Sequence, residues 1–203
     1  MGQETIRAST QRLFRGAVLL GAILIATKAY YLGLPKPHGF ADLIEYVRSL
    51  AAISYTDLWF VTGFWALARL VVALLDRWPR CATSFSFAVL SLAAFFCLYA
   101  VANIVIFGVF GGFLTYPLLA LVGDVRMVRS SVGAHLTLPV ACGLIGVPLA
   151  FGLLVAFTSR WSRPRPQSRP LQVAASIVLV VWTLIGYGMW EQTWRTACGG
   201  RKS

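Results

Sequence analysis

Long apolar stretches, separated by short segments that carry the charges, run along the whole chain. A helix that crosses the ~30 Å hydrocarbon core of a membrane needs roughly 20 mostly apolar residues. Five stretches meet this length, at about 13–34, 55–75, 83–107, 134–158 and 171–190. The pattern predicts an all-α integral membrane protein. Residues 1–203 would form a single membrane domain, a bundle of five transmembrane helices.

The segment between the third and fourth spans is harder to interpret. Residues 81–123 carry no charge, and glycines at 108, 111 and 112 interrupt the apolar pattern before Tyr116 and Pro117. The apolar remainder, 113–122, is too short to cross a membrane. We interpret residues 111–130 as a re-entrant or interfacial segment before span four. A hairpin that makes a sixth span is the alternative.

A shorter periodic segment lies between the first two spans. Charged residues alternate there with apolar residues that recur at helical spacing, namely Phe40, Leu43, Ile44, Val47 and Leu50. This pattern predicts an amphipathic helix over about 40–51, lying on the outer surface of the membrane. Packing of this helix against the bundle explains the pattern equally well.

Composition and charge agree with a membrane location. Hydrophobic residues make up 58% of the chain and charged residues 12%, with a mean hydropathy of +0.74. So few charges cannot cover a water-soluble surface, which excludes a soluble enzyme and a disordered chain.

The basic residues predict how the chain is oriented in the membrane. If the chain crosses the membrane five times, ten of the 18 Lys and Arg residues lie on the same side of the membrane as the N-terminus. The positive-inside rule then predicts a bacterial cytoplasmic membrane protein with a cytoplasmic N-terminus and a periplasmic or extracellular C-terminus. The net charge of +11 indicates anionic membrane lipids as partners, and no nucleic acid.

Metal and cofactor chemistry has little support in the sequence. The cysteines, at 81, 97, 142 and 198, form no Cys-x-x-Cys pair, and His38 and His135 are far from any cysteine cluster. We therefore expect no metal site, no cofactor and no catalytic residue in this chain.

Two ionisable residues fall inside predicted spans. Lys28 lies near the outer end of span one, and Asp57 lies just inside the outer end of span two. Because charges within a membrane are costly unless they are paired, these two residues are candidates for an intramembrane ion pair. The alternative is that Lys28 extends toward the lipid headgroups and Asp57 caps its helix.

A second candidate site precedes span four. Arg126 and Arg129 lie beside the hydroxyl groups of Ser130 and Ser131, where an apolar segment meets a charged one. Guanidinium groups next to hydroxyl groups can hold a phosphate, so these four residues could bind an anionic lipid headgroup. An ordinary solvated loop is the alternative.

Several short stretches resemble a known family. They are residues 28–33 (Lys-Ala-Tyr-Tyr-Leu-Gly), 53–58 (Ile-Ser-Tyr-Thr-Asp-Leu) and 114–117 (Leu-Thr-Tyr-Pro), with Asp124 and the serines at 130 and 131. They resemble the N-terminal transmembrane domain of bacterial sulfatase-like proteins of the alkaline phosphatase superfamily, including lipoteichoic acid synthase-type members. The resemblance implies five spans, followed by an extracytoplasmic domain that carries the metal ligands and the nucleophile.

The expected functions follow from this resemblance and from what the chain lacks. Only residues 191–203 follow the fifth span, so the resemblance implies a membrane half without its catalytic domain. The first hypothesis is a non-catalytic membrane-anchor and lipid-positioning domain for a sulfatase- or phosphotransferase-like protein. The alternatives are a structural accessory subunit of a respiratory or photosynthetic membrane complex and, third, a small transporter.

Overall fold

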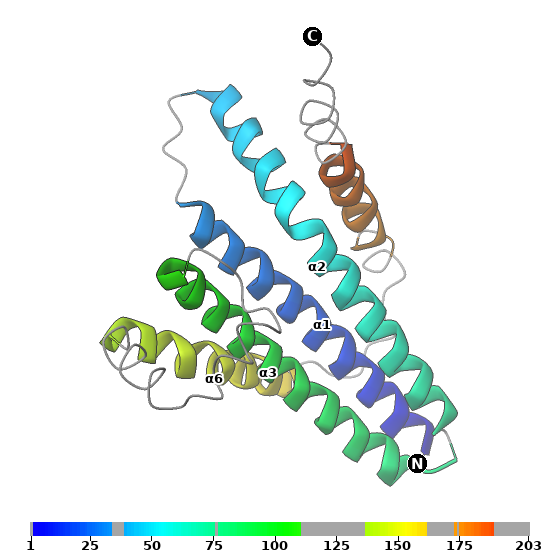
Figure 1. Cartoon of the computed structure of the whole chain (residues 1–203). Coiled ribbons are helices and arrows are strands. Elements are labelled where there is room, and N and C mark those ends of the chain that lie inside the picture. Colours follow the sequence, from blue (N-terminus) through cyan, green and yellow to red (C-terminus); the bar gives the residue numbers. More distant parts are fainter. Residues whose placement is uncertain are drawn as a thin grey trace.

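The fold is described by a computed structural model for residues 2–33, 39–75, 77–110, 137–161, 173 and 175–188. Four long helices come first, α1 (Gly2–Leu32), α2 (Phe40–Leu74), α3 (Pro79–Phe110) and α6 (Leu138–Trp161), and a shorter helix follows at Ala175–Gly188 (Figure 1). The described residues contain no strand, and the predicted all-α class is confirmed.

Four of the helices are long and apolar enough to cross a membrane. Their candidate spans are Ala8–Leu32, Phe40–Leu74, Pro79–Ile104 and Val140–Thr158. These overlap the first four predicted spans, although the second begins at Phe40 and not at about residue 55. The predicted fifth span is described only as the shorter helix Ala175–Gly188. Residues 111–130 lie outside the described part of the chain, so the re-entrant segment and the count of five spans stay predictions.

Local sequence explains where the first helices end and begin. Gly33 follows α1 with a φ of 83°, a left-handed conformation that only glycine adopts without strain, and its N–H donates to the Tyr30 carbonyl at 3.1 Å. Pro79 occupies the first position of α3, where a missing N–H breaks no helical hydrogen bond. Gly33 thus ends α1, and Pro79 begins α3.

The structure differs from the sequence-based prediction along α2. A separate outer helix was expected over 40–51, but one unbroken helix of 35 residues runs from Phe40 to Leu74. The reason is that no glycine or proline occurs between Phe40 and Thr62, and Ala51 and Ala52 at the expected break are strong helix formers. At ~1.5 Å per residue this helix is ~50 Å long, which exceeds the ~30 Å hydrocarbon thickness.

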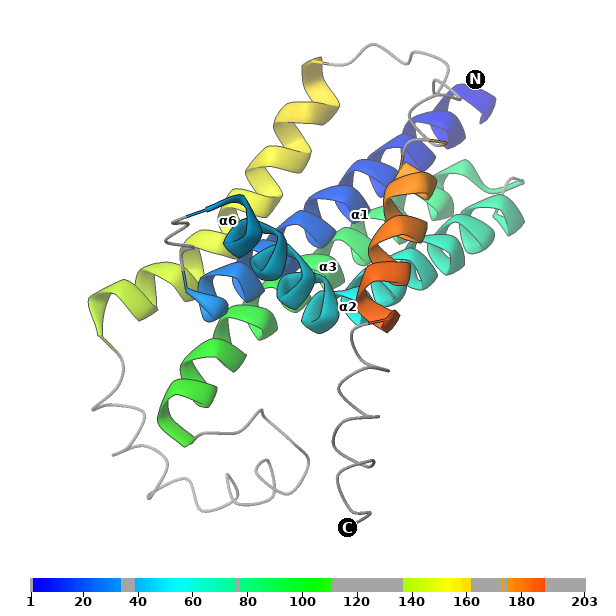
Figure 2. The same ribbon diagram turned by 90° about the horizontal axis from the view of Figure 1, so that it is seen from above.

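Helix α1 is the centre of the bundle. It lies between α2, which runs antiparallel to it, and α3, which runs parallel to it (Figure 1). Helix α6 crosses α1 and α3 (Figures 1 and 2). Two apolar clusters hold these helices together. One contains Leu20, Val61, Ala93, Cys97, Phe151 and Val155, and the other contains Leu13, Ala68, Val72, Ala82 and Val89.

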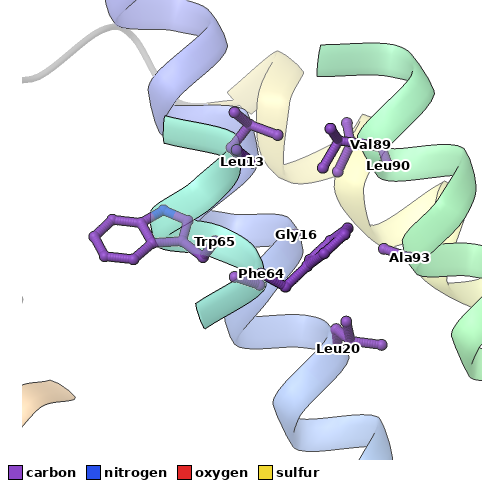
Figure 3. A pocket seen from close by; sticks show the side chains of 10 residues that line it. Leu13, Gly16, Leu20, Phe64, Trp65, Val89, Leu90 and Ala93 are labelled. Atoms are coloured by element: carbon purple, nitrogen blue, oxygen red, sulfur yellow. The ribbon is translucent and has the colours of Figure 1, made fainter. Parts of the chain in front are cut away.

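The packing between these clusters leaves almost no space. A void of about 10 Å³ lies between Leu13, Gly16 and Leu20 of α1 and Val89, Leu90 and Ala93 of α3 (Figure 3). A space of this size is at the lower limit for a single water molecule. This part of the core is therefore closely packed.

The helix Ala175–Gly188 packs against the first half of α2. The indole Nε1 of Trp182 donates to Ser54 Oγ at 3.0 Å. A Cβ placed on Gly186 would lie 2.8 Å from the carbonyl oxygen of Ala51, so only glycine allows this approach of the two backbones. Ala51 and Ser54 are buried at this contact. The sequence pattern places Ala51 at the end of a surface helix and Ser54 in the connection after it.

Large apolar side chains cover the outside of the bundle. Leu67 and Leu74 of α2 are 61% and 75% exposed, and Leu153 of α6 is 69% exposed. A water-soluble monomer rarely leaves so many large apolar side chains uncovered over several helices. Together with the four long apolar helices, this surface indicates a multi-pass membrane protein.

Candidate functional site

A large cavity opens between α1, α2 and α3 at the end of the bundle where α1 ends and α2 begins, which we call the Leu32 end. Its volume is about 790 Å³. This lies within the range of ~300–1,000 Å³ that is typical of small-molecule sites. The lining residues come from all three helices and are Leu24, Thr27, Lys28, Tyr31, Ile53, Asp57, Phe60, Phe95, Phe96, Tyr99, Ala100, Asn103 and Ile104.

The lining changes from apolar to polar toward the Leu32 end. On α1, Leu24 is followed by Thr27, Lys28 and Tyr31, and α1 runs toward this end. On α3, which runs the same way, Phe95 and Phe96 are followed by Tyr99 and Asn103; on α2, which runs the opposite way, Asp57 precedes Phe60. Ile53, Ala100 and Ile104 are the apolar exceptions at the polar end. The cavity is thus amphipathic along the helix axes.

The charged part of the cavity is an ion pair between Lys28 and Asp57. Lys28 Nζ lies 2.7 Å from Asp57 Oδ2, and the side chains are 29% and 26% exposed. Lys28 also donates to the carbonyl oxygen of Ile53, one turn before Asp57 on the same face of α2. Asp57 lies well inside α2, so it does not cap that helix.

Packed aromatic rings form the apolar part of the wall. Phe96 of α3 meets Phe60 edge-to-face at a centroid distance of 5.0 Å, and it meets Phe64 in the same way at 5.6 Å. Phe60 and Phe64 stack one turn apart on α2 at 6.1 Å. Edge-to-face pairs at these distances are favourable beyond their buried area, so the aromatic rings give this end of the cavity a defined shape.

The second predicted site cannot be compared with the cavity. Arg126, Arg129, Ser130 and Ser131 lie outside the described residues. Of the predicted site residues, the structure therefore brings together Lys28 and Asp57 only.

Sequence reasoning missed the contribution of α3 to the cavity. No site residue was predicted in the third span, because nothing in the sequence marks its aromatic residues as a site. Their spacing was an available signal, since Phe95, Phe96, Tyr99, Ala100 and Asn103 recur three and four residues apart and so share one face of a helix. That spacing alone does not separate a cavity wall from a packed core.

The side chains around the cavity are suited to binding. They offer one ammonium, one carboxylate, two phenols, a carboxamide and a hydroxyl, together with an apolar wall. In the described part of the chain no three His, Cys, Asp or Glu residues lie close enough to hold a metal ion. The arrangement can orient an amphipathic molecule through charge, hydrogen bonds and apolar contact.

Comparisons with protein-family models, with curated proteins and with solved structures find no match for this chain. The resemblance to sulfatase-like proteins stays a prediction that depends on the short sequence motifs.

Proposed function

We propose that this chain is a non-catalytic membrane domain that binds an amphipathic lipid in the cavity between α1, α2 and α3 and positions it. The observation that carries the proposal is the change of the cavity wall from apolar at Phe95 and Phe96 to charged and polar at Lys28 and Asp57. A lipid has the same order of groups along its length. The acyl chain loses little when it leaves the bilayer for this wall, because lipid tails are about as apolar as the side chains there.

The direction of this change also supports a lipid. On α1 and α3 the polar part of the cavity lies toward the end of the candidate span and the apolar part toward its middle. On α2 the candidate span extends back to Phe40, and Asp57 lies at the level of Lys28 because the two side chains form an ion pair. A lipid in one leaflet is oriented in this way, with its headgroup at the interface and its chains toward the midplane. The ligand could therefore enter from the membrane without turning over.

The expected role as an anchor is compatible with this proposal. A sulfatase- or phosphotransferase-like domain on the outer side of a bacterial cytoplasmic membrane would receive a lipid held near that surface. A catalytic domain encoded next to this chain, or as a continuation of it, would support the anchor role. A genomic neighbourhood without such a domain would count against it.

A small transporter is the second candidate function, and the ion pair is the observation in its favour. Charged residues within a span often mark the pathway of a substrate or ion. A flux across vesicles that disappears in the Lys28→Gln variant would support transport. Lipid binding without any flux would support the positioning role.

The lipid-binding proposal can be tested by filling the cavity. Ala100 lines the cavity on α3, so an Ala100→Trp side chain should occupy its space. Leu92 is 45% exposed on the same helix and does not line the cavity, so Leu92→Trp is the matched control. Phospholipids with a photoactivatable acyl chain would be incorporated into vesicles that contain the full-length protein. The cross-linked peptides would then be mapped.

We expect cross-links in the wild type within residues 24–31, 53–60 and 95–104. Ala100→Trp should reduce their yield on the order of tenfold, equivalent to about 1.4 kcal/mol of binding free energy. Leu92→Trp should leave the yield unchanged, and melting curves should show both variants folded. Equal yields in the two tryptophan variants would reject the cavity as the lipid site.

A further inference from the structure

We infer that the lipid headgroup taken by this cavity carries both a phosphate and an ammonium group, so that the ligand is a zwitterionic phospholipid. This inference rests on the proposed lipid-binding function and specifies its ligand. It concerns the cavity at the Leu32 end and is independent of the arginines at 126 and 129.

The charge of the described cavity wall is balanced before any ligand enters. Among the described residues that line the cavity, Lys28 and Asp57 are the only charged ones, and their charged atoms lie 2.7 Å apart. A headgroup with a single negative charge would leave the cavity with one uncompensated anion. Uncompensated charge is costly where apolar walls and lipid replace water. A headgroup of zero net charge avoids this cost.

Both members of the ion pair can contact a ligand without separating. An ammonium has three N–H donors, and Lys28 directs two of them at the described partners, Asp57 and the Ile53 carbonyl. A carboxylate can accept about four hydrogen bonds, and Asp57 uses the Oδ2 atom toward Lys28. A phosphate beside Lys28 and an ammonium beside Asp57 would give four alternating charges, each next to its opposite.

The aromatic side chains supply a second reason to expect a cationic group on the ligand. Tyr31, Tyr99 and Phe60 line the cavity together with Asp57. The face of an aromatic ring attracts ammonium and quaternary ammonium groups, and does so more strongly where water is excluded. A headgroup without a cationic group gains nothing comparable from the faces of these rings, so the ring faces favour a ligand with a cationic end.

The test compares headgroups on an otherwise constant lipid. The full-length wild-type protein would be placed in detergent-free vesicles of neutral lipid. Photoactivatable lipids with identical acyl chains and with phosphocholine, phosphoethanolamine or phosphoglycerol headgroups would then compete for binding to it. We expect the two zwitterionic lipids to cross-link to the cavity peptides on the order of fivefold more than the phosphoglycerol lipid, equivalent to about 1 kcal/mol. A higher cross-link yield for the phosphocholine lipid than for the phosphoethanolamine lipid would indicate that the aromatic rings contribute most to binding the cationic group. The reverse order would indicate that Asp57 contributes most.

Two variants show whether the ion pair sets this preference. Asp57→Asn leaves Lys28 without its counter-charge, so the phosphoglycerol lipid should become the preferred ligand. The double variant Lys28→Asp with Asp57→Lys restores a neutral pair, and it should keep the zwitterionic preference. The double variant and the wild-type competition decide the question even if Asp57→Asn does not fold.

The outcomes separate this inference from the proposed function. Equal cross-linking of all headgroups by the wild type, or a preference for phosphoglycerol, would overturn the inference while lipid binding stands. No cross-link to the cavity peptides with any headgroup would overturn the proposed function itself.

Discussion

Single residues explain how the helices approach one another. Lys28 and Asp57 could be placed at a similar depth from the sequence, but their contact at 2.7 Å depends on α1 and α2 being adjacent and antiparallel. The approach of the Ala175–Gly188 helix to α2 depends on Gly186 in the same way, because a side chain there would meet the backbone of Ala51.

The role of Gly186 can be tested with two glycine variants of one helix. In Gly186→Ala the new Cβ would lie 2.8 Å from the Ala51 carbonyl oxygen, so the helix must move away from α2 and strain the Trp182–Ser54 hydrogen bond. We expect a loss of about 1–3 kcal/mol of stability, as is typical of overpacking. Thermal unfolding of the purified protein measures it.

Gly188→Ala is the matched control for this prediction. A Cβ at Gly188 meets nothing within 4 Å, and the gain in helix propensity is the same at both positions. The Gly188→Ala variant should be as stable as the wild type or slightly more so. Equal melting temperatures for the two variants would contradict the close contact.

Among the helices, α2 departs most from what its pattern suggested. An amphipathic segment followed by an apolar one favoured two helices with a bend between them, yet the backbone continues as one helix through Ala51 and Ala52. The change from an amphipathic to an apolar pattern reflects a change of surroundings along the single helix α2. Residues 40–47 are mostly exposed, and the Ala175–Gly188 helix contacts α2 at Ala51, Ser54 and Tyr55.

A proline placed at the expected break tests whether α2 is continuous. Ala52→Pro would remove a hydrogen bond inside the helix and clash with the preceding turn, which costs about 3 kcal/mol or more. Ala41→Pro places the same residue in the first turn, where proline is tolerated, and should change stability little. Hydrogen exchange of the amides at 53–56 should increase only in Ala52→Pro. Similar behaviour of the two variants would indicate a break near Ala52.

At the scale of the whole molecule, the distribution of charge and the order of the helices bear on how the chain sits in a membrane. Helices α1, α2 and α3 alternate in direction, so the end of α1 and the start of α2 lie at the opposite end of the bundle from Gly2 (Figure 1). The positive-inside rule assigns the Gly2 end to the cytoplasm.

Reporter tags test this orientation. With five spans, a tag at the N-terminus should be cytoplasmic and a tag at the C-terminus periplasmic or extracellular, because an odd number of crossings separates the ends. A third tag inserted after Lys36, in the connection between α1 and α2, should behave as the C-terminal tag does. Accessibility to an impermeant reagent in intact cells measures all three. Two terminal tags on the same side would favour the six-span alternative.

The sequence by itself determined the fold class and the approximate positions of four long apolar helices, except that α2 begins at Phe40 and not near residue 55. These features depend on local properties, namely the length of an apolar run and the residues at which a helix ends or begins, such as Gly33 and Pro79. The same local information also placed Lys28 and Asp57 within predicted spans.

Only the tertiary structure decided which faces meet and where space is left between them. The cavity combines Lys28 from α1, Asp57 from α2 and Phe96 from α3, which are far apart in the chain. In a membrane protein the apolar faces toward lipid and toward other helices have the same composition, because lipid tails are as apolar as leucine. The hydrophobic pattern therefore cannot distinguish a packed contact from a cavity wall or a lipid-facing surface, and the arrangement of the helices has to do so.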